Sequence, residues 1–126
     1  MEALSRTCNP RGPAACDAAR VYGYLGSMRT RPGKRDEVIA LLLKSLDALP
    51  AAGCLSYVVS ECADDDDRIW VSEVWESAEH HSASLQLPEA RAAITTAMPM
   101  LTGEFTRQET RVVAGLGLPV PGRGRG

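Results

Sequence analysis

The chain has 126 residues, of which 44% are hydrophobic and 24% charged, and its formal net charge at pH 7 is −2. This size allows one domain, and the composition excludes a disordered chain, a collagen-like fibre and a membrane bundle. The longest aliphatic run, residues 38–43, is too short to span a bilayer, and no apolar signal segment stands at the start. The acidic balance argues against duplex nucleic acid as a partner. We therefore expect a cytoplasmic protein that binds neither nucleic acid nor membrane.

The two ends differ in composition from the middle. Residues 1–18 contain Asn-Pro and Gly-Pro pairs without periodicity, and residues 115–126 are rich in Gly, Pro and Arg. We predict a flexible N-terminal extension (1–18), a folded domain (19–114) and a C-terminal tail (115–126). The cysteines form no CxxC pair, so we expect all four to be reduced: Cys8, Cys16, Cys54 and Cys62.

Within the domain, the hydrophobic period alternates between that of strands and that of helices. Strands are predicted at 21–28, 55–60, 68–75 and 103–113, and helices at 34–49, 77–87 and 88–98. Ser77 is a good helix N-cap, and Pro88 suits the first position of a helix. The order β-α-β-β-α-α-β is the split βαβ pattern of an α+β, ferredoxin-like fold, with an antiparallel sheet and helices on one face.

The other face of that sheet needs a cover. Strand alternation directs either Trp70 or Trp75 to it, together with either the Tyr22 and Tyr24 pair or the Gly23 and Leu25 pair. A second copy laid sheet to sheet is the natural cover, and we predict a homodimer.

His80 and His81 are the only histidines. Neighbours on a helix point about 100° apart, so the two cannot chelate one metal ion together. His81 shares the apolar face of its helix with Ala78 and Leu85. A histidine there either satisfies a buried hydrogen bond or lines a cavity, and both alternatives stay open.

Three other side chains have two interpretations each. Trp75, at the end of a strand, is either core or an aromatic wall for a flat ligand, and Tyr57 is either core or a hydrogen-bonding wall. Arg91 either packs its stem on the surface or steadies an anionic substrate. The acidic run 64–67 reads as a solvated turn, since consecutive Asp residues cannot all reach one ion. No motif for a nucleotide, flavin or metal is present.

Four segments, in order and at normal spacing, resemble the antibiotic biosynthesis monooxygenase superfamily. They are Arg31-Pro32-Gly33-Lys34-Arg35-Asp36-Glu37, Gly53-Cys54-Leu55-Ser56-Tyr57, Glu73-Val74-Trp75-Glu76-Ser77-Ala78-Glu79-His80-His81 and Leu85-Gln86-Leu87-Pro88-Glu89-Ala90-Arg91. The resemblance implies a dimeric α+β barrel of ferredoxin-like protomers, with a pocket between sheet and helices. It also implies cofactor-independent oxidation of quinols or polyketide anthrones by O2, in which the substrate is the reductant.

The match to the polyketide-oxidising branch is partial. Trp75 occupies the position of that branch's strand-end Trp, and His81 that of its pocket Tyr, where an imidazole is the better base near neutral pH. Arg91 matches the branch's helix Arg if one residue of slack is allowed, and Val71 replaces its Asn. The positions that the haem-degrading branch needs are occupied by unsuitable residues: Gly26, Ser84 and Ile94.

The leading hypothesis is a monooxygenase without flavin, haem or metal that acts on a quinol or an aromatic polyketide-like small molecule. In it His81 is the base or proton relay, Arg91 stabilises the anion, and Trp75 and Tyr57 are substrate-binding walls. The alternative is a non-catalytic, small-ligand-binding dimer of the same fold, which Val71 favours. Metal-dependent catalysis is a third reading.

Overall fold

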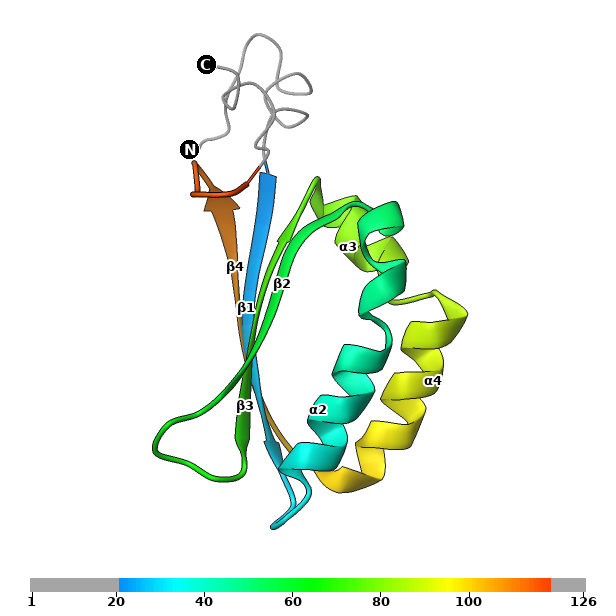
Figure 1. Ribbon diagram of the computed structural model, residues 1–126, viewed down its shortest axis with the longest axis vertical. Coiled ribbons are helices and arrows are strands. Elements are labelled where there is room, and N and C mark those ends of the chain that lie inside the picture. The colour runs from blue at the N-terminus through cyan, green and yellow to red at the C-terminus, as the bar shows by residue number, and fades with distance from the viewer. Residues whose placement is uncertain (1–20, 119–126) are drawn as a thin grey trace, which may run out of the picture.

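The computed structural model describes residues 21–118, and it confirms the α+β, ferredoxin-like order predicted from the sequence (Figure 1). The elements are β1 (Val21–Thr30), α2 (Arg35–Lys44), β2 (Cys54–Glu61), β3 (Arg68–Trp75), α3 (Ala78–Ser84), α4 (Pro88–Ala97) and β4 (Leu101–Val112). Short 3-10 turns occupy Leu46–Ala48, Pro50–Ala52 and Met98–Met100. The predicted extension 1–18, residues 119–126 of the predicted tail, Cys8 and Cys16 lie outside the described residues.

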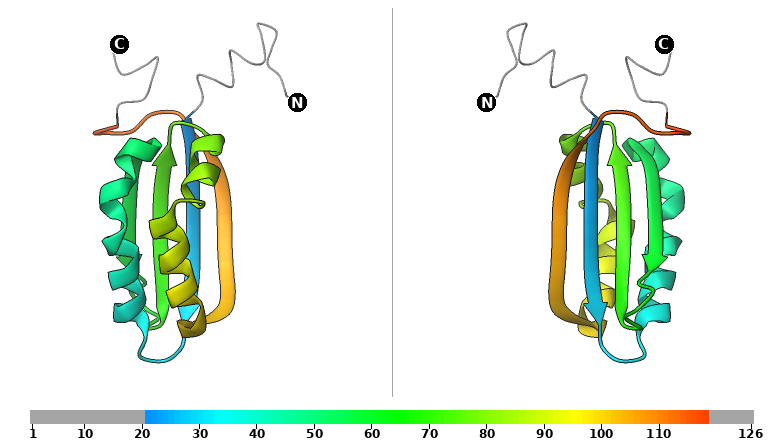
Figure 2. Two further views of the ribbon diagram at one scale, coloured as in Figure 1. Left: turned by 90° about the vertical axis from the view of Figure 1, so that its right-hand side faces the viewer. Right: turned by 90° about the vertical axis from the view of Figure 1, so that its left-hand side faces the viewer.

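The four strands form one sheet in the order β2-β3-β1-β4, and every neighbouring pair is antiparallel. Its helices lie on one face, and no helix or strand of residues 21–118 covers the opposite face, which we call the open face (Figures 1 and 2). The register of β1 and β3 sets Tyr22 opposite Trp75 and Tyr24 opposite Glu73. Because side chains alternate along a strand, these four residues share the face that the helices cover.

The predicted helix 34–49 is shorter than its periodicity suggested. The α-helical part ends at Lys44, and the hydroxyl of Ser45 donates to the carbonyl of Leu42. The chain continues through two 3-10 turns, and Leu49 between them is still buried. Apolar spacing alone does not separate an α-helix from 3-10 turns that prolong the same buried side.

The main core lies between the sheet and the pair α2 and α4. Its buried members are Val38, Ile69, Val71, Ala97 and Leu101. Val71, which stands where the polyketide-oxidising branch has an Asn, is thus a core side chain with 4% exposure. No described helix is both long and apolar enough to cross a membrane.

The open face of the sheet retains large apolar side chains. Leu25, Val58 and Trp70 are 43%, 51% and 42% exposed. Of the alternatives weighed from strand alternation, Gly23 and Leu25 therefore share the open face with Trp70, whereas Tyr22, Tyr24 and Trp75 turn toward the helices.

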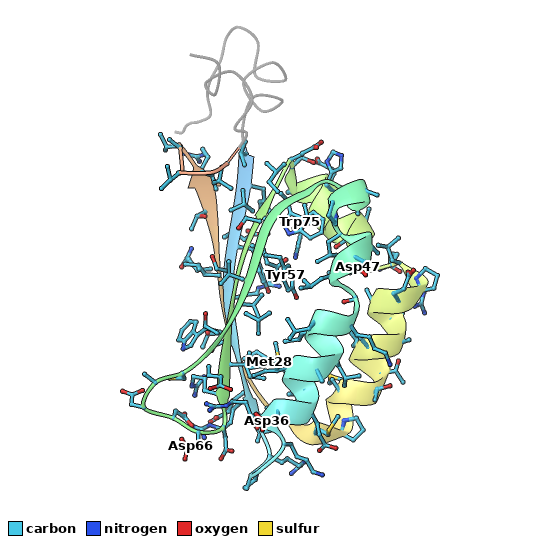
Figure 3. All side chains as sticks on the ribbon, in the orientation of Figure 1. Met28, Asp36, Asp47, Tyr57, Asp66 and Trp75 are labelled. Carbon is cyan, nitrogen blue, oxygen red and sulfur yellow. The ribbon has the colours of Figure 1, made fainter. Side chains whose placement is uncertain are left out.

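The acidic turn between β2 and β3 is more structured than predicted. Asp66 is exposed at its tip (Figure 3), but Asp65 is only 21% exposed and pairs with the guanidinium groups of Arg29 and Arg68. Glu104 of β4 pairs with the same two arginines. We call Arg29, Asp65, Arg68 and Glu104 the Asp65 cluster. Cys54 and Cys62 are free, as expected.

Candidate functional site

The start of α3 sets the directions of the two histidines. Ser77, in extended conformation, caps the helix by accepting the backbone N–H of His80 at 3.1 Å. His80 and His81 then diverge: the side chains are 46% and 12% exposed. The prediction that His81 turns inward is confirmed. Ala78 and Leu85, however, are exposed, so the apolar helix face predicted around His81 is not what buries it.

His80 instead packs beside the start of β2. A Cβ atom added to Gly53 would lie 2.5 Å from the His80 ring, and Gly53 has φ +102°, so only glycine fits this contact without strain. The Oγ of Ser77 lies 2.6 Å from Nδ1 of His80, and Glu76 lies 3.6 Å from Nε2. His80 therefore fastens α3 to β2.

Three aromatic side chains of the sheet surround the ring of His81. The ring centroids of Tyr22 and Tyr24 lie 5.4 and 4.8 Å from that of His81, and the Trp75 ring meets it edge-on at 5.6 Å. The two tyrosines are two positions apart on β1, and Trp75 is the register partner of Tyr22 on β3. The pleat of the sheet therefore assembles this apolar wall.

A buried carboxyl group completes the site. Glu73 of β3 has a side chain that is 10% exposed, and its Oε1 accepts a hydrogen bond from Nε1 of Trp75 at 2.9 Å. The same oxygen lies 3.6 Å from Nε2 of His81. Glu73 was not predicted as a site residue, although it stands between Val71 and Trp75 in the buried alternation of β3. We call His81, Glu73, Trp75, Tyr22 and Tyr24 the His81 cluster.

Burial favours the uncharged forms of both titratable partners. It is the main cause that lowers the pKa of His81, with Arg107 acting in the same direction and Glu109 opposing both. Burial also raises the pKa of Glu73, while the hydrogen bond from Trp75 opposes the rise. An imidazole whose pKa falls below its ordinary 6.5 is mostly neutral at pH 7, which is the form that accepts a proton.

Of the predicted site residues, Trp75 and Tyr57 lie on the same side of the sheet as His81, whereas Arg91 lies apart from them. Trp75 and Tyr57 both lie on the helix side of the sheet (Figure 3), and Tyr57 is the register partner of Glu73 on β2. Burial, followed by the nearby Glu73 and Cys54, raises the pKa of Tyr57. Arg91 is exposed on α4, and among residues 21–118 its guanidinium makes no hydrogen bond or ion pair. Within the described part of the chain, no hydrogen bond or ion pair joins Arg91 to the His81 cluster.

An open groove of about 490 Å³ adjoins this cluster. Its lining comes from the start of α3 and from β1 and β4: Val21, Tyr22, Ser77, Ala78, Glu79, Glu109, Thr110 and Arg111. The Tyr22 hydroxyl donates to Glu109 at 2.7 Å, and burial followed by Glu109 raises the pKa of Tyr22. Because Tyr22 both lines the groove and contacts the His81 ring, it joins the two.

A second, smaller cavity lies elsewhere. It has a volume of about 180 Å³ and an almost wholly apolar lining from α2, α4, β1 and β4 that includes Met28, Val38 and Phe105. The resemblance implied a pocket between sheet and helices, and this cavity has that place. Neither His81 nor Trp75 lines it, so the apolar space and the imidazole are at different positions along the sheet. Within residues 21–118, no three His, Cys, Asp or Glu side chains gather closely enough to hold a metal ion.

Comparison with known proteins gives a consistent family match. Residues 22–96 match the family model for antibiotic biosynthesis monooxygenase. A solved structure from Chloroflexus aurantiacus J-10-fl, provisionally designated an antibiotic biosynthesis monooxygenase, is 44% identical with a TM-score of 0.70, over 78% of this chain and 98% of that chain. A search of curated proteins finds no match.

More distant structures share the fold. One from Caulobacter crescentus CB15, with the same provisional designation, is 18% identical with a TM-score of 0.70, over 79% of this chain and 96% of that chain. Rv0793 from Mycobacterium tuberculosis is 20% identical with a TM-score of 0.66, over 75% of this chain and 97% of that chain. At these identities the likeness extends to architecture only.

Proposed function

Because this chain belongs to the antibiotic biosynthesis monooxygenase family, we propose that it is a cofactor-independent monooxygenase that oxidises a quinol or an aromatic polyketide-like molecule with O2. One observation carries the proposal: the imidazole of His81, 12% exposed, lies among three aromatic side chains, and one of these, Tyr22, lines an open groove. A neutral base in an apolar setting suits the removal of a weakly acidic proton from an aromatic substrate.

In the proposed reaction His81 takes a proton from a phenolic hydroxyl or from the methylene of an anthrone. The resulting electron-rich anion gives an electron to O2, and the two recombine at the ring carbon. One oxygen atom stays on the substrate as a new carbonyl or hydroxyl oxygen, and the other leaves as water. The substrate supplies the electrons, so no separate reductant is required.

The substrate would enter through the groove and meet the cluster at Tyr22. Trp75 and Tyr57 are the proposed walls of the site, since both are aromatic and lie on the helix side of the sheet (Figure 3). Arg91 is the proposed stabiliser of the substrate anion, and its exposed guanidinium has no partner to give up among the described residues. Substrate binding would have to bring Arg91 and His81 to the same molecule.

We also propose that the protein is a homodimer whose copies meet through the open face of the sheet. Leu25, Val58 and Trp70 give that face an apolar surface that a second copy would remove from water. Sedimentation equilibrium should give twice the mass of one chain, and Trp70→Glu should shift the mass toward that of a monomer. A monomeric wild-type protein would refute this part of the proposal.

The experiment for the activity measures O2 consumption by metal-free protein with a panel of hydroquinones and anthrones. His81→Phe keeps an aromatic ring but removes the base, and should lower kcat by about 10²- to 10⁴-fold. Ser82→Ala, a control at an exposed neighbouring position of α3, should keep most of the activity. The absence of O2 consumption with every substrate would overturn the proposal.

A non-catalytic ligand-binding dimer is the second candidate, and the packing of His81 favours it. The ring is in contact with three other rings, and Val71 supplies no polar contact to a ligand. Under this reading the protein binds the same aromatic molecules, measured by calorimetry, without turnover, and His81→Phe leaves their affinity unchanged.

A further inference from the structure

The imidazole of His81 has two ring nitrogens, and its chemistry depends on which of them bears the proton. A neutral imidazole has one N–H donor and one lone pair, and the partner of one nitrogen fixes the state of the other. Nε2 of His81 lies 3.6 Å from Oε1 of Glu73. Among residues 21–118, neither ring nitrogen makes a hydrogen bond within ordinary distance limits, so Glu73 is the nearest identified partner of the ring.

The position of Glu73 is fixed by the sheet and by Trp75. It lies inside β3, opposite Tyr24 on β1 and Tyr57 on β2. Its Oε1 accepts the indole N–H of Trp75 at 2.9 Å, and that donor stabilises the ionised form of a carboxyl group that is 10% exposed. An ionised carboxyl group can only accept hydrogen bonds, so a nitrogen that faces it favours the protonated state.

We infer that Glu73 is a positioning residue: it holds His81 in the tautomer with hydrogen on Nε2 and so leaves Nδ1 as the atom that accepts the substrate proton. This inference rests on the proposed function for its catalytic consequence, but not for the tautomer itself. The separation exceeds the upper limit of a hydrogen bond, roughly 3.2 Å, by about 0.4 Å. Catalytic hydrogen bonds are often long without substrate and tighten when it binds.

The other charged groups around His81 do not replace Glu73. Glu109 and Arg107 of β4 act on the charge of the imidazole in opposite directions, and Glu109 is already the acceptor of the Tyr22 hydroxyl. Tyr57 faces Glu73 from β2 and shares its buried side of the sheet. Among the residues that the structure describes, only Glu73 has a carboxyl oxygen within 4.0 Å of a nitrogen of the His81 ring.

The direct test is the tautomer of His81, read at pH 8 by long-range ¹H–¹⁵N NMR of the histidine rings. The chain has two histidines, and His80→Gln removes the second set of signals. The wild-type ring should show hydrogen on Nε2. A ring with hydrogen on Nδ1, as a protonated Glu73 donating to Nε2 would produce, would overturn the inference without any variant of Glu73.

Two variants then separate position from charge. Glu73→Gln keeps an acceptor oxygen and should keep the tautomer, whereas Glu73→Met removes the acceptor and should give a mixture. With an active quinol or anthrone, Glu73→Met should lower kcat by about tenfold or more, and Glu73→Gln should recover most of it. An unchanged tautomer in Glu73→Met would contradict the assignment. If no substrate is oxidised but the tautomer behaves as expected, the proposed activity is wrong and the positioning role stands.

Discussion

Two of the clusters in which acidic and basic side chains meet, the Asp65 cluster and the His81 cluster, have opposite electrostatic character. In the Asp65 cluster, a hydrogen bond from the backbone N–H of Asp67 lowers the pKa of Asp65, and the nearby Arg29 and Arg68 act in the same direction. In the His81 cluster, burial raises the pKa of Glu73 and lowers that of His81. The first cluster is partly open to water, and aromatic rings enclose the second.

The difference shows how surroundings assign a role to the same pair of charges. Several donors and access to water keep Asp65 ionised, so its cluster ties the β2–β3 turn to β1 and β4. Glu73 has one strong donor, Trp75, and His81 has none within hydrogen-bond distance among the described residues. A buried histidine whose pKa is lowered can accept a proton from a ligand, whereas a pair held fully charged serves to fasten the chain.

Of the changes considered, Trp75→Phe should lower the free energy of unfolding the most. The change removes the only hydrogen bond donor identified for Glu73 among the described residues and leaves a buried acceptor without a partner, a loss of about 1–3 kcal/mol in the free energy of unfolding. Urea denaturation followed by circular dichroism measures it. A variant as stable as the wild type would mean that the indole N–H contributes little to the cluster.

The second comparison is between neighbouring acids of the β2–β3 turn. Asp65→Ala removes the partner of Arg29 and Arg68 and should lower the urea midpoint clearly, whereas Asp66→Ala, at an exposed position, should leave it nearly unchanged. Equal midpoints for the two variants would show that the Asp65 cluster does not fasten the turn.

The third prediction concerns stability against pH in two variants. In His81→Phe, Glu73 remains: the stability it contributes is fully present below its ordinary pKa of 4.5 and is lost as pH rises through its raised folded-state pKa. In Glu73→Gln, His81 remains: its contribution is present above 6.5 and is lost as pH falls through its lowered folded-state pKa. The free energy of unfolding of His81→Phe should therefore fall from acidic to neutral pH, whereas that of Glu73→Gln should rise. Urea denaturation at a series of pH values measures both profiles. Parallel profiles would contradict the burial assigned to one of the groups.

The smallest expected effect is that of salt. Raising NaCl from about 0.1 to 1 M shortens the screening length from roughly 10 to 3 Å, which weakens charge pairs that water reaches. The stability difference between wild type and Asp65→Ala should shrink, while the NMR-detected pKa of His81 should hardly move because aromatic rings enclose it. A His81 pKa that followed the salt concentration would place the ring in contact with solvent.

The strands of this fold follow closely from local sequence. The alternation of β-branched and aromatic residues predicts 68–75, and β3 has those bounds. The end of the first helix does not follow, because 3-10 turns preserve the apolar spacing up to Leu49. The ion-pair partners could not be predicted from the sequence either. Arg29 and Asp65 are far apart in the chain and meet only because β1 passes the β2–β3 turn.

The candidate site was predictable in part. Helix periodicity predicted that His81 lies on the inner face of its helix. The residues that bury it come from β1 and β3, and no local sequence pattern fixes the register of these strands. Glu73 was accessible from alternation, since an acid at a buried strand position needs a partner. Arg91 was predicted to stabilise an anion because it matches the position of the helix Arg in the polyketide-oxidising branch. The sequence pattern of an exposed helix residue does not indicate how far it lies from other elements.

The fit of Gly53 against the His80 ring has a consequence for the neighbouring residue. α3 has only seven residues and is seated on β2 through this contact and through the bond from the Glu76 backbone N–H to the Gly53 carbonyl at 2.9 Å. A methyl group at position 53 would push His80 outward, and His81 would move with the same short helix. One added carbon atom, at a residue that takes no part in the proposed chemistry, would thereby change the distance between the imidazole of His81 and Glu73.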